Sequence, residues 1–176
     1  WSGCNYGSIA TYYALNRILT GMGKSVLMID KPVLSDDDIE LKDTHARRFA
    51  NQHYNISKQY KLRQMNQLNN LCDAFLIGSD QVWNYGISKN FGKAFYLDFA
   101  SAEKKKIAYG VSFGHGIDFA PGDEREVISD YMSYFDGIGT READGVKLCR
   151  ECYGIKAEQV LDRPKIPDPI PVLPLY

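Results

Sequence analysis

Short apolar runs alternate with amphipathic segments along most of this chain. Each run has apolar residues in succession and ends at glycine or at polar residues, which is typical of a strand buried in a sheet. We therefore predict strands at residues 26–29, 74–77, 107–111, 137–140 and 159–162.

Between these runs, apolar residues recur every three or four positions, which predicts helices with one buried face. The predicted helices cover residues 8–23, 123–135 and 143–153. Residues 39–71 are polar and favour one or two surface helices, and the lysine run 104–106 is interpreted as a solvated entry to a strand.

Strands that alternate with helices predict an α/β domain, Rossmann-like and doubly wound, with a mostly parallel sheet. We expect this domain to span residues 1–162. Residues 163–176 are rich in proline, which excludes a helix or a central strand and indicates an extended tail or linker. Because the chain opens with a loop and a helix, we expect the first strand of a βαβ unit to lie upstream.

The composition favours a globular domain over a nucleic-acid-binding or membrane-spanning protein. The chain has 176 residues, 44% of them hydrophobic and 24% charged, as in one ordinary globular domain. Its net charge of −1 gives no bulk attraction to nucleic acid or to an anionic membrane. The apolar runs are too short to span a bilayer, and no signal peptide is visible.

Four cysteines are present, and Cys149 and Cys152 form a lone Cys-x-x-Cys. A zinc ribbon needs a second such pair, so we expect no metal site, and Cys72 and Cys149 resemble buried apolar residues. This cysteine usage fits a reducing cytosol, which predicts a cytoplasmic protein. No Gly-x-Gly-x-x-Gly fingerprint occurs, so no nicotinamide or flavin cofactor is expected.

The polar run after residues 74–77 is the strongest candidate site. Gly78 is followed by Ser79, Asp80, Gln81 and Asn84, with Trp83 among them. A buried parallel strand delivers such a loop to its carboxyl end, where ligands of open α/β sheets bind. In the alternative interpretation, these residues form only a turn and a helix cap, with Trp83 filling the core.

A second polar loop, Asn5-Tyr6-Gly7-Ser8, leads into the first predicted helix. Free amides and the helix dipole favour an anion at such an N-terminus, and Gly7 lets a ligand approach the backbone. An ordinary helix cap by Asn5 or Ser8 is the alternative.

Two further loops follow the strands predicted at 107–111 and 137–140. In the first, Ser112 and Gly114 precede His115, which is either a general acid or base or a surface residue. In the second, Arg141 is well placed to bind a phosphate or carboxylate in a bidentate way, and Glu142 to orient it. A surface ion pair between Arg141 and Glu142 is the alternative.

Taken in order, these motifs resemble the N-terminal half of the polysaccharide pyruvyl transferase family. The resemblance runs from about Asn5 to Asp162, and its most specific piece is Gly-Ser-Asp-Gln-Val-Trp-Asn at residues 78–84. The other matching pieces are Asn5-Tyr6-Gly7, Tyr13-Ala14-Leu15, Cys72-Asp73, Tyr96-Leu97-Asp98-Phe99, Ser112-Phe113-Gly114, Arg141-Glu142 and Val160-Leu161-Asp162.

The resemblance implies a fold similar to GT-B glycosyltransferases, in which two Rossmann-like domains face each other across a cleft. It also implies transfer of the pyruvyl group of phosphoenolpyruvate to two sugar hydroxyls as a ketal, in cell-surface polysaccharide biosynthesis. Phosphoenolpyruvate is then the donor substrate, a sugar or lipid-linked oligosaccharide is the acceptor, and no cofactor is needed. The residue matching Arg141 is implied to bind the phosphoenolpyruvate anion.

We therefore expect Asp80 and Arg141 to be catalytic. Asp80 would accept a proton from the attacking hydroxyl or position it, and Trp83 would offer an apolar face to the sugar. The expected substrate-binding residues are Asn5, Tyr6, Gly7, Ser79, Gln81, Trp83, Ser112, Gly114 and Glu142.

The family's remaining catalytic groups, a histidine and basic residues, lie in its second half. Since this chain runs into Arg163-Pro164 and a proline-rich stretch, we expect it to be incomplete for catalysis and to need a second domain or a homo-oligomer. Two alternatives remain: a nucleotide-sugar glycosyltransferase of GT-B-like fold, and a non-catalytic sugar-binding or assembly module.

Overall fold

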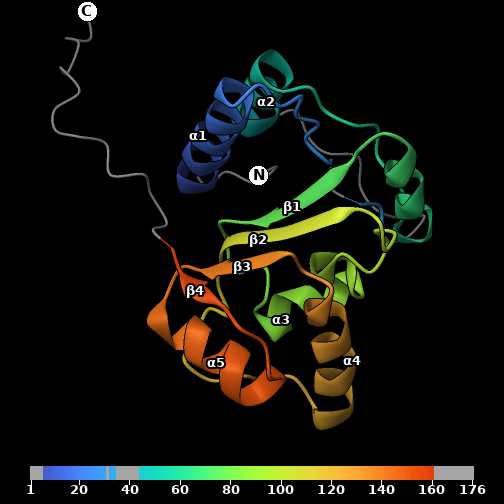
Figure 1. Ribbon diagram of the computed structural model, residues 1–176. Helices are drawn as coiled ribbons and strands as arrows, with labels where there is room; N and C mark the ends of the chain where they lie inside the picture. Colours follow the sequence, from blue (N-terminus) through green and yellow to red (C-terminus); the bar gives the residue numbers. More distant parts are fainter. Residues whose placement is uncertain (1–5, 31, 35–43, 161–176) are drawn as a thin grey trace, which may run out of the picture.

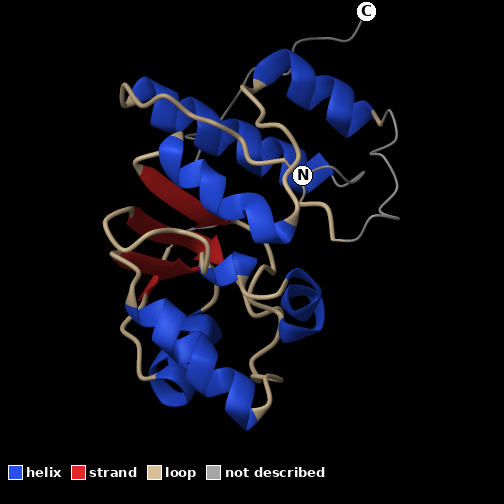
Figure 2. Cartoon of the chain, turned by 90° about the vertical axis from the view of Figure 1, so that its right-hand side faces the viewer, coloured by secondary structure: helices blue, strands red, loops and turns tan. Residues whose placement is uncertain are grey.

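The computed structural model describes residues 6–30, 32–34 and 44–160 (Figure 1). A central sheet lies between two groups of helices. Helices α1 (Tyr6–Gly21) and α2 (His45–His53) lie on one side, and α3 (Tyr85–Ser88), α4 (Gly122–Ser133) and α5 (Ala143–Tyr153) lie on the other. The same layers are seen from the side in Figure 2. This arrangement is a Rossmann-like, doubly wound α/β fold.

Within the described residues, the sheet has four strands in the order β1-β2-β3-β4, and every neighbouring pair is parallel. The strands are β1 (Ala74–Gly78), β2 (Lys105–Val111), β3 (Gly137–Thr140) and β4 (Glu158–Gln159). The mostly parallel sheet predicted from the apolar runs is thus confirmed, and the described strands are all parallel. Of the last predicted strand, residues 161–162 lie outside the described residues, as does the tail expected at 163–176.

Three short 3₁₀ segments complete the described elements: η1 (Leu62–Asn70), η2 (Lys89–Phe91) and η3 (Ala94–Tyr96). The helices predicted at 8–23, 123–135 and 143–153 are observed within two residues of their expected bounds. The polar stretch 39–71 provides α2 and η1. Its residues 39–43 lie outside the described residues.

The apolar run at 26–29 is not a strand of the sheet, and this prediction was wrong. Met28 forms only an isolated parallel bridge with Ile56, in which Met28 N donates to Asn55 O (2.7 Å) and Ser57 N donates to Met28 O (2.9 Å). An apolar run becomes a strand of a sheet only where a neighbouring strand pairs with its backbone along most of its length. Among the described residues, this run finds a partner at one position, and the outer edge of β1 has no partner strand.

Two groups of buried side chains hold the layers together. One lies between the sheet and α4 and α5; it includes Val111, Ile128 and Cys149. The other lies on the η1 side and includes Leu68 and Phe75. Of the two cysteines expected to be buried, Cys149 is, whereas Cys72 is only partly buried.

Lys106 also differs from expectation, because it is not a solvated residue. Only 5% of its surface is exposed, and its ammonium lies 5.5 Å from the centroid of the Tyr134 ring. The burial of β2 alternates residue by residue, and Lys106 occupies an inward position. Its aliphatic stem is therefore buried while its charge reaches an aromatic face.

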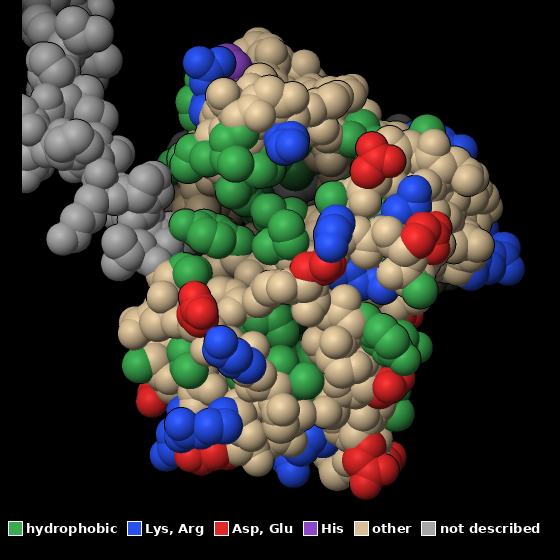
Figure 3. Space-filling model, viewed as in Figure 1, with side chains coloured by type: hydrophobic (Ala, Val, Ile, Leu, Met, Phe, Trp, Pro, Cys, Tyr) green, Lys and Arg blue, Asp and Glu red, His purple; other side chains and the backbone are tan. Residues whose placement is uncertain are grey.

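The opposite face of β2 is open. Ile107 and Tyr109 are 37% and 36% exposed, and Figure 3 shows hydrophobic side chains gathered between the α1 layer and the lower body of the molecule. None of the helices in the described ranges has the length and apolar character required to cross a membrane.

Candidate functional site

The candidate site begins where β1 ends. Gly78 has a φ of +147°, and a Cβ added there would lie 1.9 Å from the carbonyl oxygen of Tyr109. The next residue, Ser79, has a φ of 62°, and its amide donates to the same carbonyl oxygen at 2.9 Å. The absence of a side chain at Gly78 lets β1 close against β2, so the polar run starts at the carboxyl edge of the sheet.

Two backbone hydrogen bonds join the loop after β1 to the loop after β2. The amide of Ser112 donates to Asp80 O (3.1 Å), and the amide of Trp83 donates to Ser112 O (3.1 Å). The Cα of Gly114 faces the side chains of Gln81 and Asn84, which lie 2.6 Å from the position that a Cβ would take. These loops therefore form one packed unit, in which Gly114 is required for close approach.

Asp80 connects this unit to the first turn of α1. Its Oδ1 accepts a hydrogen bond from the amide of Gln81 (2.8 Å), and its Oδ2 accepts one from the hydroxyl of Ser8 (3.3 Å). Ser8 belongs to α1 and is not its N-cap. The carboxylate is thus oriented at both oxygens and lies partly buried between the sheet edge and α1.

Tyr12 is a neighbour of Asp80 that the sequence interpretation did not identify. Burial first, and then the negative charge of Asp80, raise the pKa of Tyr12 from 10.0 to about 12. The phenol therefore stays protonated at neutral pH. Tyr12 follows Ser8 by four positions, so both share one face of α1. That spacing was the signal in the sequence, but only the fold shows that this face meets Asp80.

Arg141 reaches the same edge from β3. Its amide donates to Val111 O at 3.0 Å, next to Ser112, and its Nε donates to Glu142 Oε1 at 2.6 Å. The side chain of Arg141 is 25% exposed and that of Glu142 is 44% exposed. The ion pair between them, kept open as an alternative, is therefore present, and it orients the guanidinium at a position that solvent can reach.

Trp83 lies in the core and not in the site. Its ring is 1% exposed, it packs against Tyr96 and Phe113, and its Nε1 donates to Phe95 O (3.0 Å). It offers no open face to a sugar, so the expected contact between Trp83 and substrate is corrected to core packing. The ring is part of the buried group of side chains between the sheet and helices α4 and α5, whereas the polar residues around it in sequence remain at the edge of the sheet.

Ser112 is likewise fully buried, and its Oγ accepts a hydrogen bond from the amide of Gly114 at 2.9 Å. It shapes the turn after β2 instead of presenting its hydroxyl to a ligand. Ser79 is 8% exposed. His115 is exposed, and its ring meets that of Phe119 edge-on at 5.5 Å.

The first loop is described only in part. Asn5 lies outside the described residues, and so does the side chain of Tyr6, with which α1 begins. Gly7 is exposed in the first turn of α1. The structure therefore brings Asp80, Gln81, Gly114 and Arg141 to one edge of the sheet, with the first turn of α1 beside Asp80.

Within residues 6–30, 32–34 and 44–160, no group of three histidine, cysteine, aspartate or glutamate side chains is placed to hold a metal ion. A family model described as polysaccharide pyruvyl transferase matches residues 5–162, which is most of the chain. No curated protein and no solved structure matches the chain.

Proposed function

Since the chain belongs to the polysaccharide pyruvyl transferase family, we propose that it serves the transfer of the pyruvyl group of phosphoenolpyruvate to two hydroxyls of a sugar. In this reaction two C–O bonds form at the enol carbon and the bond from that carbon to the phosphate oxygen breaks. Of the two protons leaving the sugar hydroxyls, one is balanced by protonation of the methylene carbon and the other by the released phosphate.

The observation that supports this proposal most directly is the position of Arg141 beside the loops that carry Asp80. Phosphoenolpyruvate has a phosphate and a carboxylate, and both suit a planar guanidinium held by a neighbouring carboxylate. Arg141 is oriented by Glu142 and remains partly exposed. We assign to it the binding of the donor anion and the stabilisation of phosphate as it leaves.

We assign the role of the base to the carboxylate of Asp80. Ser8 and Gln81 fix its two oxygens, and each carboxylate oxygen retains a further lone pair that can accept a proton or a hydrogen bond from a sugar hydroxyl. Tyr12, kept protonated at neutral pH, adds a neutral hydroxyl near the carboxylate. Asp80 therefore positions the attacking hydroxyl and Ser8 positions Asp80.

Protonation of the methylene carbon requires an acid that this group of residues does not include. We assign this acid to a domain that faces the carboxyl edge of the sheet, as the family resemblance implies. The acceptor is then a sugar or a lipid-linked oligosaccharide bound between the two. Cys72, Cys149 and Cys152, the cysteines within the described residues, are free, which is consistent with a site in the reducing cytoplasm.

The test has two parts. The first measures phosphate release from phosphoenolpyruvate with a panel of sugar acceptors. The isolated chain is expected to show no turnover, because the loss of one of several cooperating catalytic groups removes most of the rate. The second titrates phosphate into the wild type and Arg141→Ala, with affinity expected to fall about tenfold in the variant.

Arg150→Ala is the matched control for the titration. Arg150 is an exposed arginine on α5 and, like Arg141, it pairs with the glutamate that follows it. Its loss should leave phosphate affinity unchanged. Equal affinity in the wild type and Arg141→Ala would remove Arg141 from the site, and robust turnover by the isolated chain would refute the assignment of the acid to a facing domain.

A further inference from the structure

A hollow that is separate from the loops around Asp80 lies beside the carboxyl-terminal half of α1. It measures about 400 Å³ and lies between α1, the turn that follows it and the end of α2. Its lining residues are Tyr13, Asn16, Arg17, Thr20, Lys24, Ser25, Val26, His53 and Asn55. We propose that this hollow, here called the α1–α2 hollow, binds a phosphate group of a ligand distinct from the donor at Arg141.

The charge of the hollow points to an anion. Arg17 and Lys24 line it, and no aspartate or glutamate does. Neither cation has an ion pair with any of the residues that the structure describes. Both cations are exposed to solvent, so an oxyanion can reach the hollow and be attracted by both.

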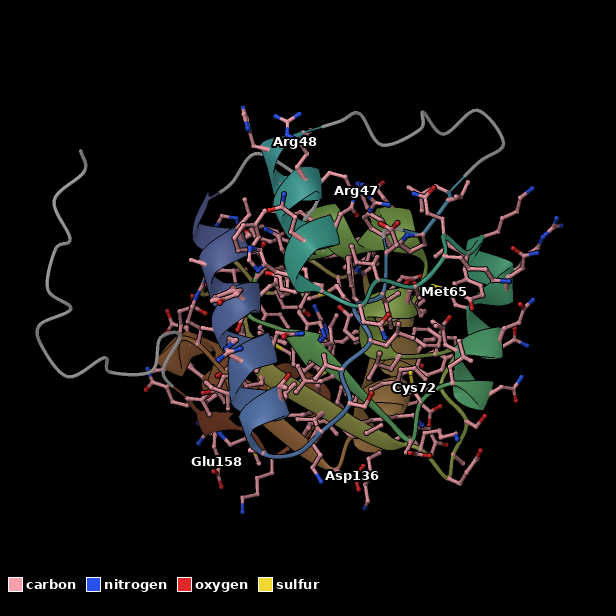
Figure 4. The ribbon with its side chains drawn as sticks, turned by 90° about the horizontal axis from the view of Figure 1, so that it is seen from above. Arg47, Arg48, Met65, Cys72, Asp136 and Glu158 are labelled. Atoms are coloured by element: carbon pink, nitrogen blue, oxygen red, sulfur yellow. The ribbon has the colours of Figure 1, made fainter. Side chains whose placement is uncertain are left out.

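Other cations of this layer are already paired. Arg47 of α2 forms an ion pair with the buried Asp30 at 2.8 Å, and Arg48 lies 3.0 Å from Nδ1 of His45. In Figure 4, which looks down on α1 and α2, Arg48 extends outward from the first part of α2. The contrast with Arg17 and Lys24 indicates that the charges of the α1–α2 hollow are not part of the same network.

Neutral donors complete the chemistry. Asn16, Asn55 and Ser25, which carry neutral donors, line the hollow together with the cations. The hydroxyl of Thr20 donates to Asn16 O (2.8 Å) and is occupied. A guanidinium, an ammonium and several neutral donors match a group with many acceptor oxygens. Phosphate fits this set better than a carboxylate, which has only two oxygens.

The walls of the hollow are fixed by backbone and ring contacts. Helix α1 ends in a Schellman-type cap, in which Lys24 N donates to Leu19 O (3.0 Å) and Gly23 N donates to Thr20 O (2.9 Å). The cap fixes the backbone of Lys24 at the hollow, which Arg17 also lines. On the facing wall, the ring of His53 meets that of Tyr13 edge-on at 5.6 Å.

The α1–α2 hollow is too far from Asp80 to share one small ligand with it. Ser8, which contacts Asp80, and Arg17 are nine positions apart on α1, or roughly 14 Å along the helix axis. The inference therefore does not rest on the proposed pyruvyl transfer, and binding at the hollow can be followed without any measure of activity.

The experiment follows backbone amide signals of the full chain by two-dimensional NMR during titration with inorganic pyrophosphate at constant ionic strength. The amides of Lys24, Ser25 and Asn55 are expected to shift and saturate, separately from that of Arg141. Arg17→Glu should weaken the binding at these amides about tenfold or more. Lys147→Glu, an equal charge change at an exposed lysine of α5, should leave the binding unchanged.

A second arm distinguishes a soluble phosphate from a lipid headgroup. Phosphatidylcholine vesicles with and without phosphatidic acid are sedimented with the wild type and Arg17→Glu. Binding only to the acidic vesicles, lost in Arg17→Glu, identifies a lipid phosphate as the ligand, and saturable pyrophosphate binding without vesicle binding identifies a soluble one. Amide shifts that do not saturate, or equal behaviour of Arg17→Glu and Lys147→Glu, overturn the proposal.

Discussion

The hydroxyl of Ser8 donates a hydrogen bond to Oδ2 of Asp80 at 3.3 Å, across 72 positions of sequence. This bond connects the first turn of α1 to the loop after β1, and it is the contact through which the helix orients the candidate base. Tyr12 lies one turn further along the same face of α1, so the same arrangement places it near Asp80.

A double-mutant cycle tests this bond. We expect Ser8→Ala and Asp80→Ala each to lower the free energy of unfolding, with a coupling energy of about 0.5–1.5 kcal/mol between them, the usual range for a hydrogen bond in a protein. Urea unfolding of the wild type, both single variants and the double variant measures it. Strictly additive effects would show that the two side chains do not interact in solution.

Tyr12 should make the protein sensitive to alkali. The unfolded chain loses the Tyr12 proton near pH 10, whereas the folded chain, in which its pKa is about 12, keeps it. The folded state then binds more protons, so stability falls as pH rises through this range, by roughly 1.4 kcal/mol per pH unit for one group. Below this range Tyr12 makes no difference to the pH dependence.

Tyr12→Phe should therefore reduce the loss of stability between about pH 8 and pH 11 by about 1 kcal/mol. Urea unfolding at the two pH values checks this, with Tyr134→Phe as the control because the Tyr134 ring is 55% exposed. The same alkaline loss in Tyr12→Phe as in the wild type would contradict the partly buried position of the phenol near Asp80.

Gly78 should tolerate no side chain. A Cβ would lie 1.9 Å from Tyr109 O, and the backbone has a φ of +147°, so we expect Gly78→Ala to cost more than about 4 kcal/mol or to prevent folding. Gly137→Ala is the control, because nothing lies within 4 Å of its added Cβ. Thermal unfolding distinguishes them, and similar midpoints for both variants would be inconsistent with the close contact of β1 with β2.

Trp83→Phe should lower stability without weakening the binding of phosphate. The change removes the indole that donates to Phe95 O and leaves that carbonyl unpaired, at a cost of about 1–3 kcal/mol. Thermal unfolding and the phosphate titration used for Arg141→Ala measure the two effects on one protein. A loss of phosphate affinity with unchanged stability would return Trp83 to the site.

Much of the fold was predictable because one face of the sheet is buried against α4 and α5. Short runs such as 74–77 and 137–140 are most stable as buried strands. The helices between them show apolar residues at every third or fourth position. The run at 26–29 has the same composition, but composition does not say whether a neighbouring strand is available. Lys106 shows a related limit, because a charged residue in a strand can be buried along its stem.

The arrangement of the loops in the candidate site was predictable, whereas the positions of their side chains were less so. Loops that follow parallel strands share one edge, which brings the loops of Asp80 and Arg141 to the same edge without knowledge of side chains. The sequence does not show which side of a loop faces the core, so Trp83 and Ser112 were expected to contact substrate and are buried instead. Tyr12 was missed because the contact of α1 with the loop after β1 is a tertiary feature.

Each strand of the sheet pairs with the strand that precedes it in the chain, in the order β1-β2-β3-β4. The sheet can therefore assemble during synthesis, strand by strand, as the ribosome releases each one. Among the described residues, no strand has to be inserted between two that are already paired. Of these strands β4 joins last, so β1, β2 and β3 and the loops of Asp80 and Arg141 can be in place once α5 has left the ribosome.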